Sequence, residues 1–294
     1  MELVCDLYIG TWNFMKSIYV HTLVKNEERW LWFAVNSVAP YVDKILLWDT
    51  GSTDRSIEIE KELVKKYRYK ISFRQVGEVD SQKFTEVRQE MLDASNCDWV
   101  MILDGDEVWW EDGIKRAIDV INKRGDDLES LVHRYYNLVG DIYHYQEEKA
   151  GRYSIDGVTG HLTIRFFNRR IPGLHFSNPH GTQGIYDGDG VLIQERDSKK
   201  RLHLDDYYLH FTHLVRSSTV FKDKEVVKRN IKYKYELGIP FPRGFKYPEV
   251  FYQKRPDFVF DPWQKRSGYY VLRAFFETPI RIIKRRIWKG KIGY

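Results

Sequence analysis

The sequence predicts an α/β fold, in which a mostly parallel sheet is flanked by helices. Apolar runs of strand length alternate with segments of helical period through the first half of the chain. Acidic and small polar residues follow several of the runs. Regular alternation of this kind is typical of βαβ units, whose strands are parallel.

The elements of the first half are short and follow one another closely. Four predicted strands, bounded by turn residues, are 18–24, 44–49, 70–76 and 99–103. The helices between and after them are marked by apolar residues at spacings of three and four. Their apolar faces contain Leu31, Ala34, Val35 and Val38 in the first helix, which ends near Pro40; Phe84, Val87, Met91 and Leu92 in the third; and Ile114, Ala117, Ile118 and Ile121 in the fourth. The second helix is predicted over 54–67, after a turn of small polar residues.

The second half is less regular. Segments 130–140 and 161–168 have the composition of longer strands, and glycine-rich loops are predicted near 151–160 and 181–190. Five prolines between residues 238 and 268 disfavour long helices there. We expect an irregular, basic C-terminal extension.

Composition indicates a globular protein of a reducing compartment. The chain has 294 residues, 43% hydrophobic and 15% aromatic, enough to bury a substantial core. Residues 1–24 lack a signal-peptide pattern, and no eighteen apolar residues run together, so we expect a cytoplasmic, non-spanning protein. Cys5 and Cys97 lie far apart, which favours free thiols.

The most specific local feature is the acidic cluster Asp104, Gly105, Asp106 and Glu107, directly after the strand 99–103. Ligands of parallel sheets gather at the carboxyl ends of strands. Two carboxylates separated by one small residue can converge on Mg²⁺ or Mn²⁺, and such an ion can hold a diphosphate. The alternative is a solvated polar turn.

Two further features have competing interpretations. Asp187, Gly188 and Asp189 repeat the tripeptide without a strand leading into it, so we expect an ordinary turn there. Asp49 ends the strand 44–49, where a carboxylate can accept hydrogen bonds from a nucleobase or ribose. Helix capping explains the serine and threonine that follow, but it explains Asp49 less well.

Three motifs at strand ends, in order, resemble family 2 glycosyltransferases of the GT-A fold. They are VKNEERW (24–30), WDTGSTDRS (48–56) and DWVMILDGDE (98–107). The resemblance is strong over about 18–125 and general from 128 to about 235. It implies a nucleotide-sugar donor, often a UDP-sugar, and Mn²⁺ or Mg²⁺. By position it implies a donor and metal site formed by Thr22, Val24, Lys25, Asn26, Glu27, Asp49, Asp104, Gly105 and Asp106.

The resemblance leaves the catalytic base open. Family members commonly have Arg-Asn in the helix before the metal strand, where this chain has Arg88 and Gln89, so Arg88 is expected on the donor side. A common His-Glu pair is replaced by a stretch that contains His180 and no acid. The candidate bases are Asp141, His180, Asp187 and Asp189. A late histidine could complete the metal shell; of His210 and His213, we favour His213.

The resemblance implies one GT-A domain over 1–235, with a nucleotide-binding half (18–125) and an acceptor half (126–235), followed by the extension 236–294. We expect sugar transfer to a saccharide or lipid-linked acceptor, as in polysaccharide or lipopolysaccharide biosynthesis. One alternative is a nucleotidyltransferase acting on a sugar phosphate. Another is a non-catalytic, membrane-associated binding module of the same fold.

The extension ends in a basic segment with helical character. Thr278 and Pro279 can begin a helix over 278–291, with Ile280, Ile283 and Ile287 on one face. Such a helix could lie on the anionic inner face of a membrane, with Trp288 near the headgroups, or dock on the domain. No nucleic-acid recognition motif is present, so we expect no nucleic-acid partner.

Overall fold

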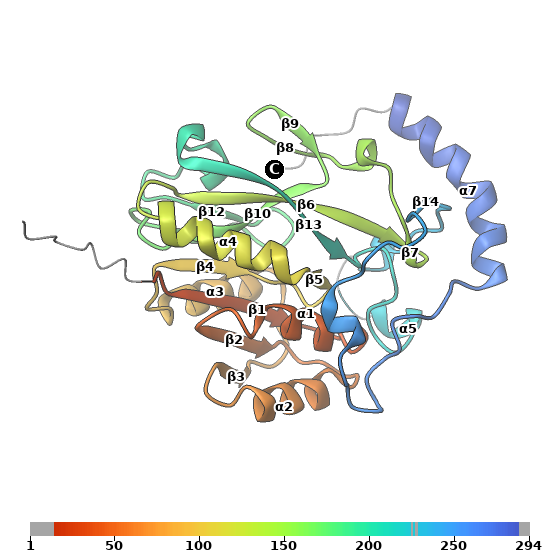
Figure 1. Cartoon of the computed structure of the whole chain (residues 1–294), viewed down its shortest axis with the longest axis horizontal. Coiled ribbons are helices and arrows are strands. Elements are labelled where there is room, and N and C mark those ends of the chain that lie inside the picture. The colour runs from red at the N-terminus through yellow and green to blue at the C-terminus, as the bar shows by residue number, and fades with distance from the viewer. Residues whose placement is uncertain (1–14, 225, 227–228, 288–294) are drawn as a thin grey trace, which may run out of the picture.

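The protein is described here by a computed structural model covering residues 15–224, 226 and 229–287. Cys5, Trp288 and the end of the expected tail helix lie outside these residues. Within them the chain forms a large mixed sheet flanked by helices, which confirms the predicted α/β class (Figure 1). None of the helices in this part of the chain is long and apolar enough to span a bilayer.

The sheet has a parallel half and a mixed half. Its order is β14-β7-β6-β10-β4-β1-β2-β3, and β5 and β13 join it off this path. The parallel half comprises β1 (Ile18–Val24), β2 (Lys44–Asp49), β3 (Ile71–Gln75) and β4 (Trp99–Ile102). The remaining strands are β5 (Glu107–Trp109), β6 (Ser130–Val139), β7 (Asp141–Tyr145), β10 (Leu162–Asn168), β13 (Arg201–His210) and β14 (Ile239–Pro240). Two small hairpins stand apart: β8 (Tyr153–Ile155) with β9 (Val158–Gly160), and β11 (His175–Ser177) with β12 (Gly184–Tyr186).

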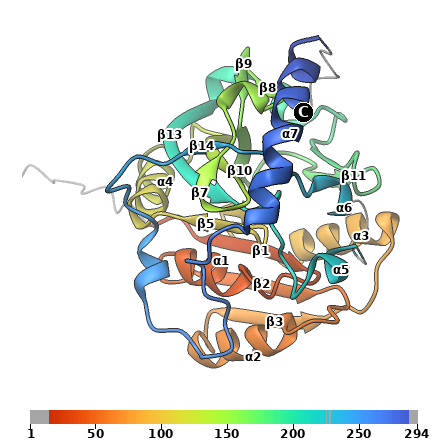
Figure 2. The same ribbon diagram turned by 90° about the vertical axis from the view of Figure 1, so that its right-hand side faces the viewer.

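The longer helices cover the sheet, and one lies at the margin of the molecule (Figures 1 and 2). They are α1 (Leu31–Val38), α2 (Ser56–Lys66), α3 (Ser81–Asp93), α4 (Glu111–Arg124) and, at the margin, α7 (Gly268–Ile287). Two single turns, α5 (Val220–Asp223) and α6 (Arg229–Lys232), follow β13. Short 3₁₀ turns are η1 (Glu148–Ala150), η2 (Ile193–Glu195), η3 (Ser198–Lys200) and η4 (Glu249–Tyr252).

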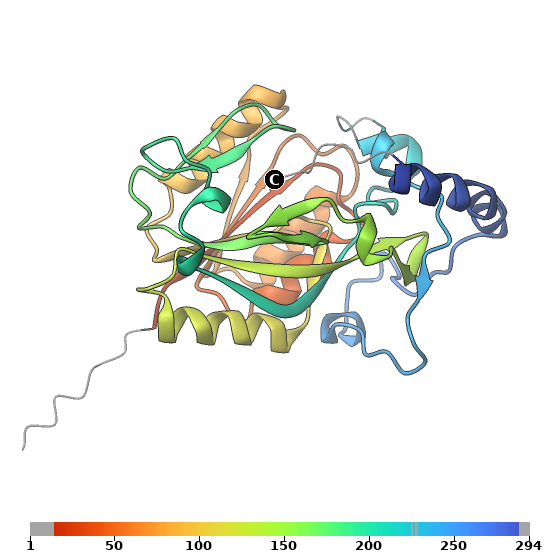
Figure 3. The ribbon, with the colours of Figure 1, turned by 90° about the horizontal axis from the view of Figure 1, so that it is seen from above.

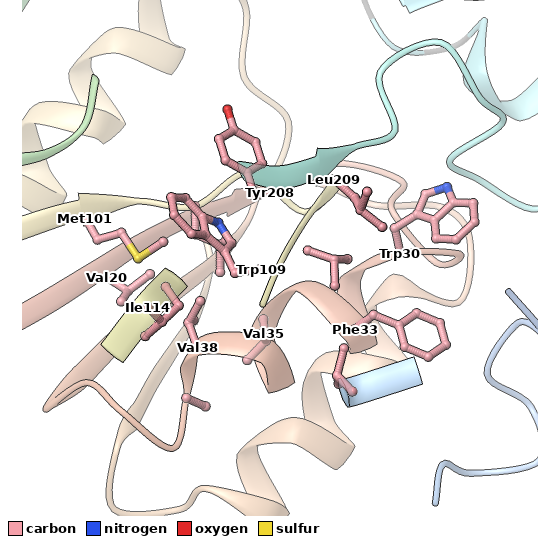
Figure 4. Packing of buried hydrophobic residues seen from close by; sticks show 14 of the residues in the cluster. Val20, Trp30, Phe33, Val35, Val38, Met101, Trp109, Ile114, Tyr208 and Leu209 are labelled. Carbon is pink, nitrogen blue, oxygen red and sulfur yellow. The ribbon is translucent and has the colours of Figure 1, made fainter. Parts of the chain in front are cut away.

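The main core lies between the sheet, α1 and α4 (Figure 4). Trp109 stacks on Tyr208 with ring centroids 4.6 Å apart, which joins β5 to β13. All eight residues of α1 are buried, because α2, β5 and η4 all pack against this helix. Phe33 of α1 and Phe251 of η4 have ring centroids 5.0 Å apart.

The predicted strands and helices of the first half are confirmed, with ends shifted by a few residues, and so are the two longer strands after residue 128. The predicted start of the tail helix is wrong. α7 begins at Gly268 and continues through Pro279. Thr278 is an interior residue, since its hydroxyl donates to the carbonyl of Ala274 at 2.6 Å. An interior proline costs about 3 kcal/mol or more, a cost that packing of the preceding turns must offset.

Candidate functional site

The loops after β1 and β2 are held together at the carboxyl edge of the parallel sheet. Val24 lies opposite Asp49 in the register of the two strands, so both loops leave the sheet at the same level. Asn26 has a φ of 54°, a left-handed conformation that asparagine tolerates. Its side-chain oxygen accepts the backbone N–H of Thr53 at 2.7 Å, and its own N–H donates to Ser52 Oγ at 2.8 Å. The expected nucleotide-binding residues of the two loops are therefore in contact.

Asp49 holds its own loop with one oxygen. Oδ1 accepts the backbone N–H groups of Gly51 at 2.8 Å and Ser52 at 2.9 Å, and Gly51 turns the chain with a φ of 85°. Oδ2 is buried and has no hydrogen-bond partner among the described residues. A buried acceptor without a partner is costly, so Oδ2 is suited to receive a donor group of a ligand.

The other expected pocket residues differ in accessibility. Thr22 and Val24 are fully buried in β1, and Thr22 Oγ1 has no partner among the described residues. Lys25 points across the loop, where its Nζ donates to the carbonyl of Gly51 and lies 3.3 Å from Glu78. Thr22 and Val24 therefore lie inside the sheet beneath the loop, and Lys25 lies at the partly exposed edge of the loop.

Asp104 is held between two arginines. Its side chain is 36% exposed, with Oδ1 3.1 Å from Arg88 Nη2 and Oδ2 3.2 Å from Arg165 Nη2. Removal from water works to raise the pKa of Asp104, but the charges of Arg165 and Arg88 outweigh it and keep that pKa well below its usual range. Arg165 also pairs with the buried Glu107. Arg88 thus lies beside the acidic cluster, as expected.

Asp106 is buried and lies beside His210. β5 and β13 pair so that His210 is opposite Glu107, the residue after Asp106. His210 Nε2 is 3.6 Å from Asp106 Oδ2, and its Nδ1 is buried with no partner among the described residues. Burial lowers the pKa of His210 to about 4 in spite of the charge of Asp106, so the ring is neutral at pH 7, the form that binds metals.

His213, the favoured late metal ligand, is engaged elsewhere. Its Nδ1 lies 2.6 Å from the carbonyl oxygen of Lys232, and its Nε2 lies 3.1 Å from both Asn137 Nδ2 and Lys234 Nζ. Both ring nitrogens therefore already have neighbours. The geometry favours His210 over His213, because strand pairing brings His210 to Asp106.

The donor atoms at Asp106 suit a hard divalent ion, although the protein does not form a complete cage for one. Among the described residues, no three His, Cys, Asp or Glu side chains converge to hold a metal. Mg²⁺ is commonly bound by one or two carboxylates together with substrate phosphates and water. The carboxylate of Asp106 fits that pattern, but its Oδ2 is paired with Arg216, a contact that a bound cation would have to replace. The neutral imidazole of His210 lies beside the same oxygen and is a further nitrogen donor.

Two arginines from a distant segment complete the charge balance. Arg216 pairs with Asp106 and lies 3.3 Å from Glu27 Oε1. Arg229 pairs with the same oxygen of Glu27 at 2.5 Å and donates to the carbonyl of Asn26 at 2.6 Å. These contacts fix the segment after β13 against the loop that follows β1.

Gly105 permits the close approach of the acidic cluster to that loop. A Cβ atom at Gly105 would lie 2.9 Å from Glu27 Cγ, inside normal contact distance. The structure thus gives Gly105 a packing role at the expected donor site.

The four candidate bases are dispersed, and two of them stabilise local structure. Asp141 Oδ1 lies 2.6 Å from His144 Nδ1, and Oδ2 accepts the N–H of Arg266, which joins β7 to the C-terminal region. Asp187 Oδ1 accepts the N–H groups of Asp189 and Val191, as expected of a turn. Asp189 is exposed within that turn.

His180 is the candidate base connected most directly to the acidic cluster. Its ring centroid is 4.3 Å from that of Phe84 in α3. The guanidinium of Arg88 lies 5.5 Å from the centroid of the same Phe84 ring, and Arg88 also pairs with Asp104. The assignment of the base stays a prediction, with His180 favoured by position.

Three residues that the structure brings to the cluster were not predicted from the sequence: Arg165, Arg216 and Arg229. Arg165 had a weak signal, since it interrupts the apolar strand 161–168 with a charge. Arg216 and Arg229 had none, because they are 110 and 202 residues from the acids they contact.

The sequence of residues 19–187 matches the model of a family described as glycosyl transferase family 2. This match covers more than half of the chain and includes the loops after β1 and β2 and the acidic cluster. Among curated proteins, no sequence matches.

Several solved structures match part of this chain at low sequence identity. TarS from S. aureus gives a TM-score of 0.42 at 14% identity, over 66% of this chain and 36% of TarS. Glucosyl-3-phosphoglycerate synthase from Mycobacterium tuberculosis, in complex with phosphoglyceric acid, gives 0.42 at 16% identity, over 66% of this chain and 72% of the synthase. The same synthase with Mn²⁺ and UDP-glucose gives 0.41 at 15% identity, over 66% and 71%.

Proposed function

Since the chain belongs to glycosyl transferase family 2 and is therefore a glycosyltransferase, we propose that it moves a sugar from a nucleoside diphosphate, by preference a UDP-sugar, to a saccharide or lipid-linked acceptor. The observation that carries the proposal is the meeting of three features at one sheet edge: the β1 loop, the unpartnered oxygen of Asp49, and the charged cluster around Asp106. Ligands of α/β sheets bind at this edge.

The nucleoside would lie against the paired loops of β1 and β2. Asp49 Oδ2 offers a buried acceptor there, for a ribose hydroxyl or a base N–H. Asn26 and Gly51 fix the backbone around it through unusual dihedral angles. This arrangement supports binding without large rearrangement of the loops.

The diphosphate would lie between the acidic cluster and the arginines. Asp106 and His210 would hold Mn²⁺ or Mg²⁺, which supplies positive charge to the leaving diphosphate. Arg216 contacts Asp106 directly, and it is therefore placed to reach the same phosphates. Asp104, fixed by Arg88 and Arg165, would face the donor sugar.

The acceptor hydroxyl must lose a proton as the new bond forms. We assign this role to His180, on the strength of its contact with Phe84 and, through Arg88, with the cluster. An imidazole is a common proton acceptor in such a step.

Calorimetric titration with UDP, with and without Mn²⁺, tests the cation site. Wild-type protein is expected to bind UDP more tightly with Mn²⁺, and Asp106→Asn to lose roughly tenfold to a hundredfold of that gain. Asp189→Asn is the matched control, because it alters the last acid of the second, exposed Asp-Gly-Asp turn.

Equal metal-dependent binding by Asp106→Asn and wild type would reject the assignment.

Chromatography of the products separates the reaction classes. Glycosyl transfer releases a nucleoside diphosphate, whereas nucleotidyl transfer to a sugar phosphate would release pyrophosphate. A non-catalytic module would release neither.

A further inference from the structure

Helix α7 is attached to the body of the protein by one face. Tyr270 and Ala274 are buried, and the Tyr270 hydroxyl donates to the carbonyl of Lys234 at 2.7 Å. Thr278 accepts the N–H of Leu237, and Arg285 pairs with Glu236 at 2.6 Å. The attached face also includes Arg281, which donates to the carbonyl of Tyr235. These positions are spaced by three and four residues, as one face of a helix requires.

The opposite face of α7 is apolar and exposed. Residues two positions after those of the attached face lie about 200° away around the helix axis. These outward residues are Leu272, Phe276, Ile280, Ile283 and Ile287, and their exposed fractions run from 56% to 79%. Phe275 beside them is 63% exposed.

An outward apolar face is unusual for a helix on a soluble protein. Surface helices normally turn their polar side to water, and contiguous apolar patches of this kind mark sites of interaction. Figures 1 and 3 show α7 along the outer margin of the molecule, away from α1 and α2, so the body of the protein leaves this face open.

The same helix is strongly basic. Gly268–Ile287 contains one acidic residue, Glu277, and five basic residues: Arg273, Arg281, Lys284, Arg285 and Arg286. Glu277 is bound by both Arg273 and Arg281. Arg281 and Arg285 lie on the attached face, so the basic residues that flank the outward apolar face are Arg273, Lys284 and Arg286.

We propose that the outward face of α7 is a docking surface for an anionic lipid bilayer, with its aliphatic and phenyl side chains between the acyl chains and the flanking Arg273, Lys284 and Arg286 at the headgroups. Amphipathic helices with a basic flank bind membranes through this combination of apolar burial and charge attraction. A second copy of α7 would supply the apolar contact but would bring like charges together, whereas anionic headgroups complement them.

This surface extends the proposed function without depending on it. The helix is attached to the body through Tyr270, and the body carries the donor site. Docking would hold the enzyme at the surface where lipid-linked saccharides are found. Failure of the donor-site assignment would leave the vesicle experiment unaffected.

Co-sedimentation of the full chain with phosphatidylcholine vesicles, with and without phosphatidylglycerol, tests the proposal. Wild-type protein is expected to bind the anionic vesicles, and Phe276→Ser and Ile283→Ser to weaken binding by roughly tenfold for each side chain. Arg286→Gln is expected to weaken binding to the anionic vesicles by about fivefold. Tyr69→Ser is the control, because Tyr69 is an exposed aromatic residue between α2 and β3.

Absence of binding to anionic vesicles, or binding that Phe276→Ser leaves unchanged, would overturn the proposal. So would a dimer in sedimentation equilibrium that Phe276→Ser dissociates, since the face would then serve a second copy. Unchanged UDP affinity in the variants would show that the donor site is intact and that only docking has been altered.

Discussion

At the scale of single residues, strand pairing decides which histidine can serve the acidic cluster. His210 and His213 are three residues apart, yet only His210 lies in β13 opposite β5. His213 follows the strand and fills a polar niche beside Asn137. Sequence distance gave no basis for separating them, because both belong to one aromatic run, residues 207–213.

We therefore predict different effects for the two substitutions. His210→Ala should weaken Mn²⁺-dependent UDP binding by roughly tenfold to a hundredfold, because it removes a ligand from a sparse metal shell. His213→Ala should retain that dependence but lower the free energy of unfolding by about 1–3 kcal/mol, because the carbonyl of Lys232 and the amide of Asn137 lose a buried neighbour. Calorimetry and urea unfolding measure the two quantities. A greater loss of metal dependence in His213→Ala would restore His213 as the ligand.

A buried glutamate near the donor site should make stability depend on pH. Both oxygens of Glu60 in α2 are buried without a partner among the described residues. Burial, with a further contribution from Asp49, raises the pKa of Glu60 from 4.5 to about 9. Below pH 4.5 the folded and unfolded chains both hold the proton, so its contribution to stability is fully present. As pH rises towards 9 the unfolded chain ionises first, and that contribution is lost.

The Glu60→Gln side chain cannot ionise. The free energy of unfolding of this variant at pH 7 should therefore be about 3 kcal/mol higher than that of the wild type. The difference should vanish near pH 4. Urea unfolding across this pH range measures it, with Glu62→Gln on the partly exposed face of the same helix as control. A difference between Glu60→Gln and wild type that stays constant with pH would show that Glu60 is ionised in the folded protein.

At the scale of elements, the hydrophobic pattern was sufficient to predict those helices and strands that pack through a regular apolar face or run. The strands β1 to β4 are apolar runs between turn residues, and α3 and α4 have regular apolar faces, so their sequences contain the necessary information. β13 was missed because its sequence, RLHLDDYYLH, alternates poorly and contains two adjacent acids. Its register against β6 shifts at that point, between Leu204 and Tyr207.

The residues of the candidate site also divide into those that the local sequence predicts and those that it does not. The position of Asp49, Asp104 and Asp106 at one edge of the sheet could be predicted, because each stands at a strand end and the order of parallel strands places those ends together; their roles stay predictions. The arginines that neutralise them could not, because Arg165, Arg216 and Arg229 arrive through tertiary folding from elements far along the chain. Pro279 shows a related limit. The sequence pattern predicts that it begins a helix, but in the structure it lies inside α7, because the turns before it are packed against the body of the protein.

At the scale of the whole molecule, the C-terminal region is joined to the main core. The domain boundary predicted near residue 235 stays a prediction, but the segment after it contributes Tyr247, Val250, Phe251 and Val259 to the same buried cluster as α1. Trp30, directly before α1, contacts Phe260 of this segment, and Phe33 of α1 contacts Phe251. α7 is attached more lightly, with Tyr270 and Ala274 as its buried residues.

Two truncations test where the folding unit ends. A chain ending at residue 267 should keep a cooperative thermal transition, since it loses α7 but retains the segment that covers α1. A chain ending at residue 235 should not, because it removes four buried core side chains worth about 1.5–3 kcal/mol each, together comparable to the whole stability of a typical domain. Circular dichroism during heating distinguishes them. Phe251→Ala in the full chain is a milder perturbation of the same contact, and it should lower the free energy of unfolding by about 3–5 kcal/mol. Cooperative unfolding of the 1–235 chain at a temperature near that of the full chain would establish a true domain boundary there, and the packing of Phe251 against Phe33 would then be a contact between separate units and not part of one core.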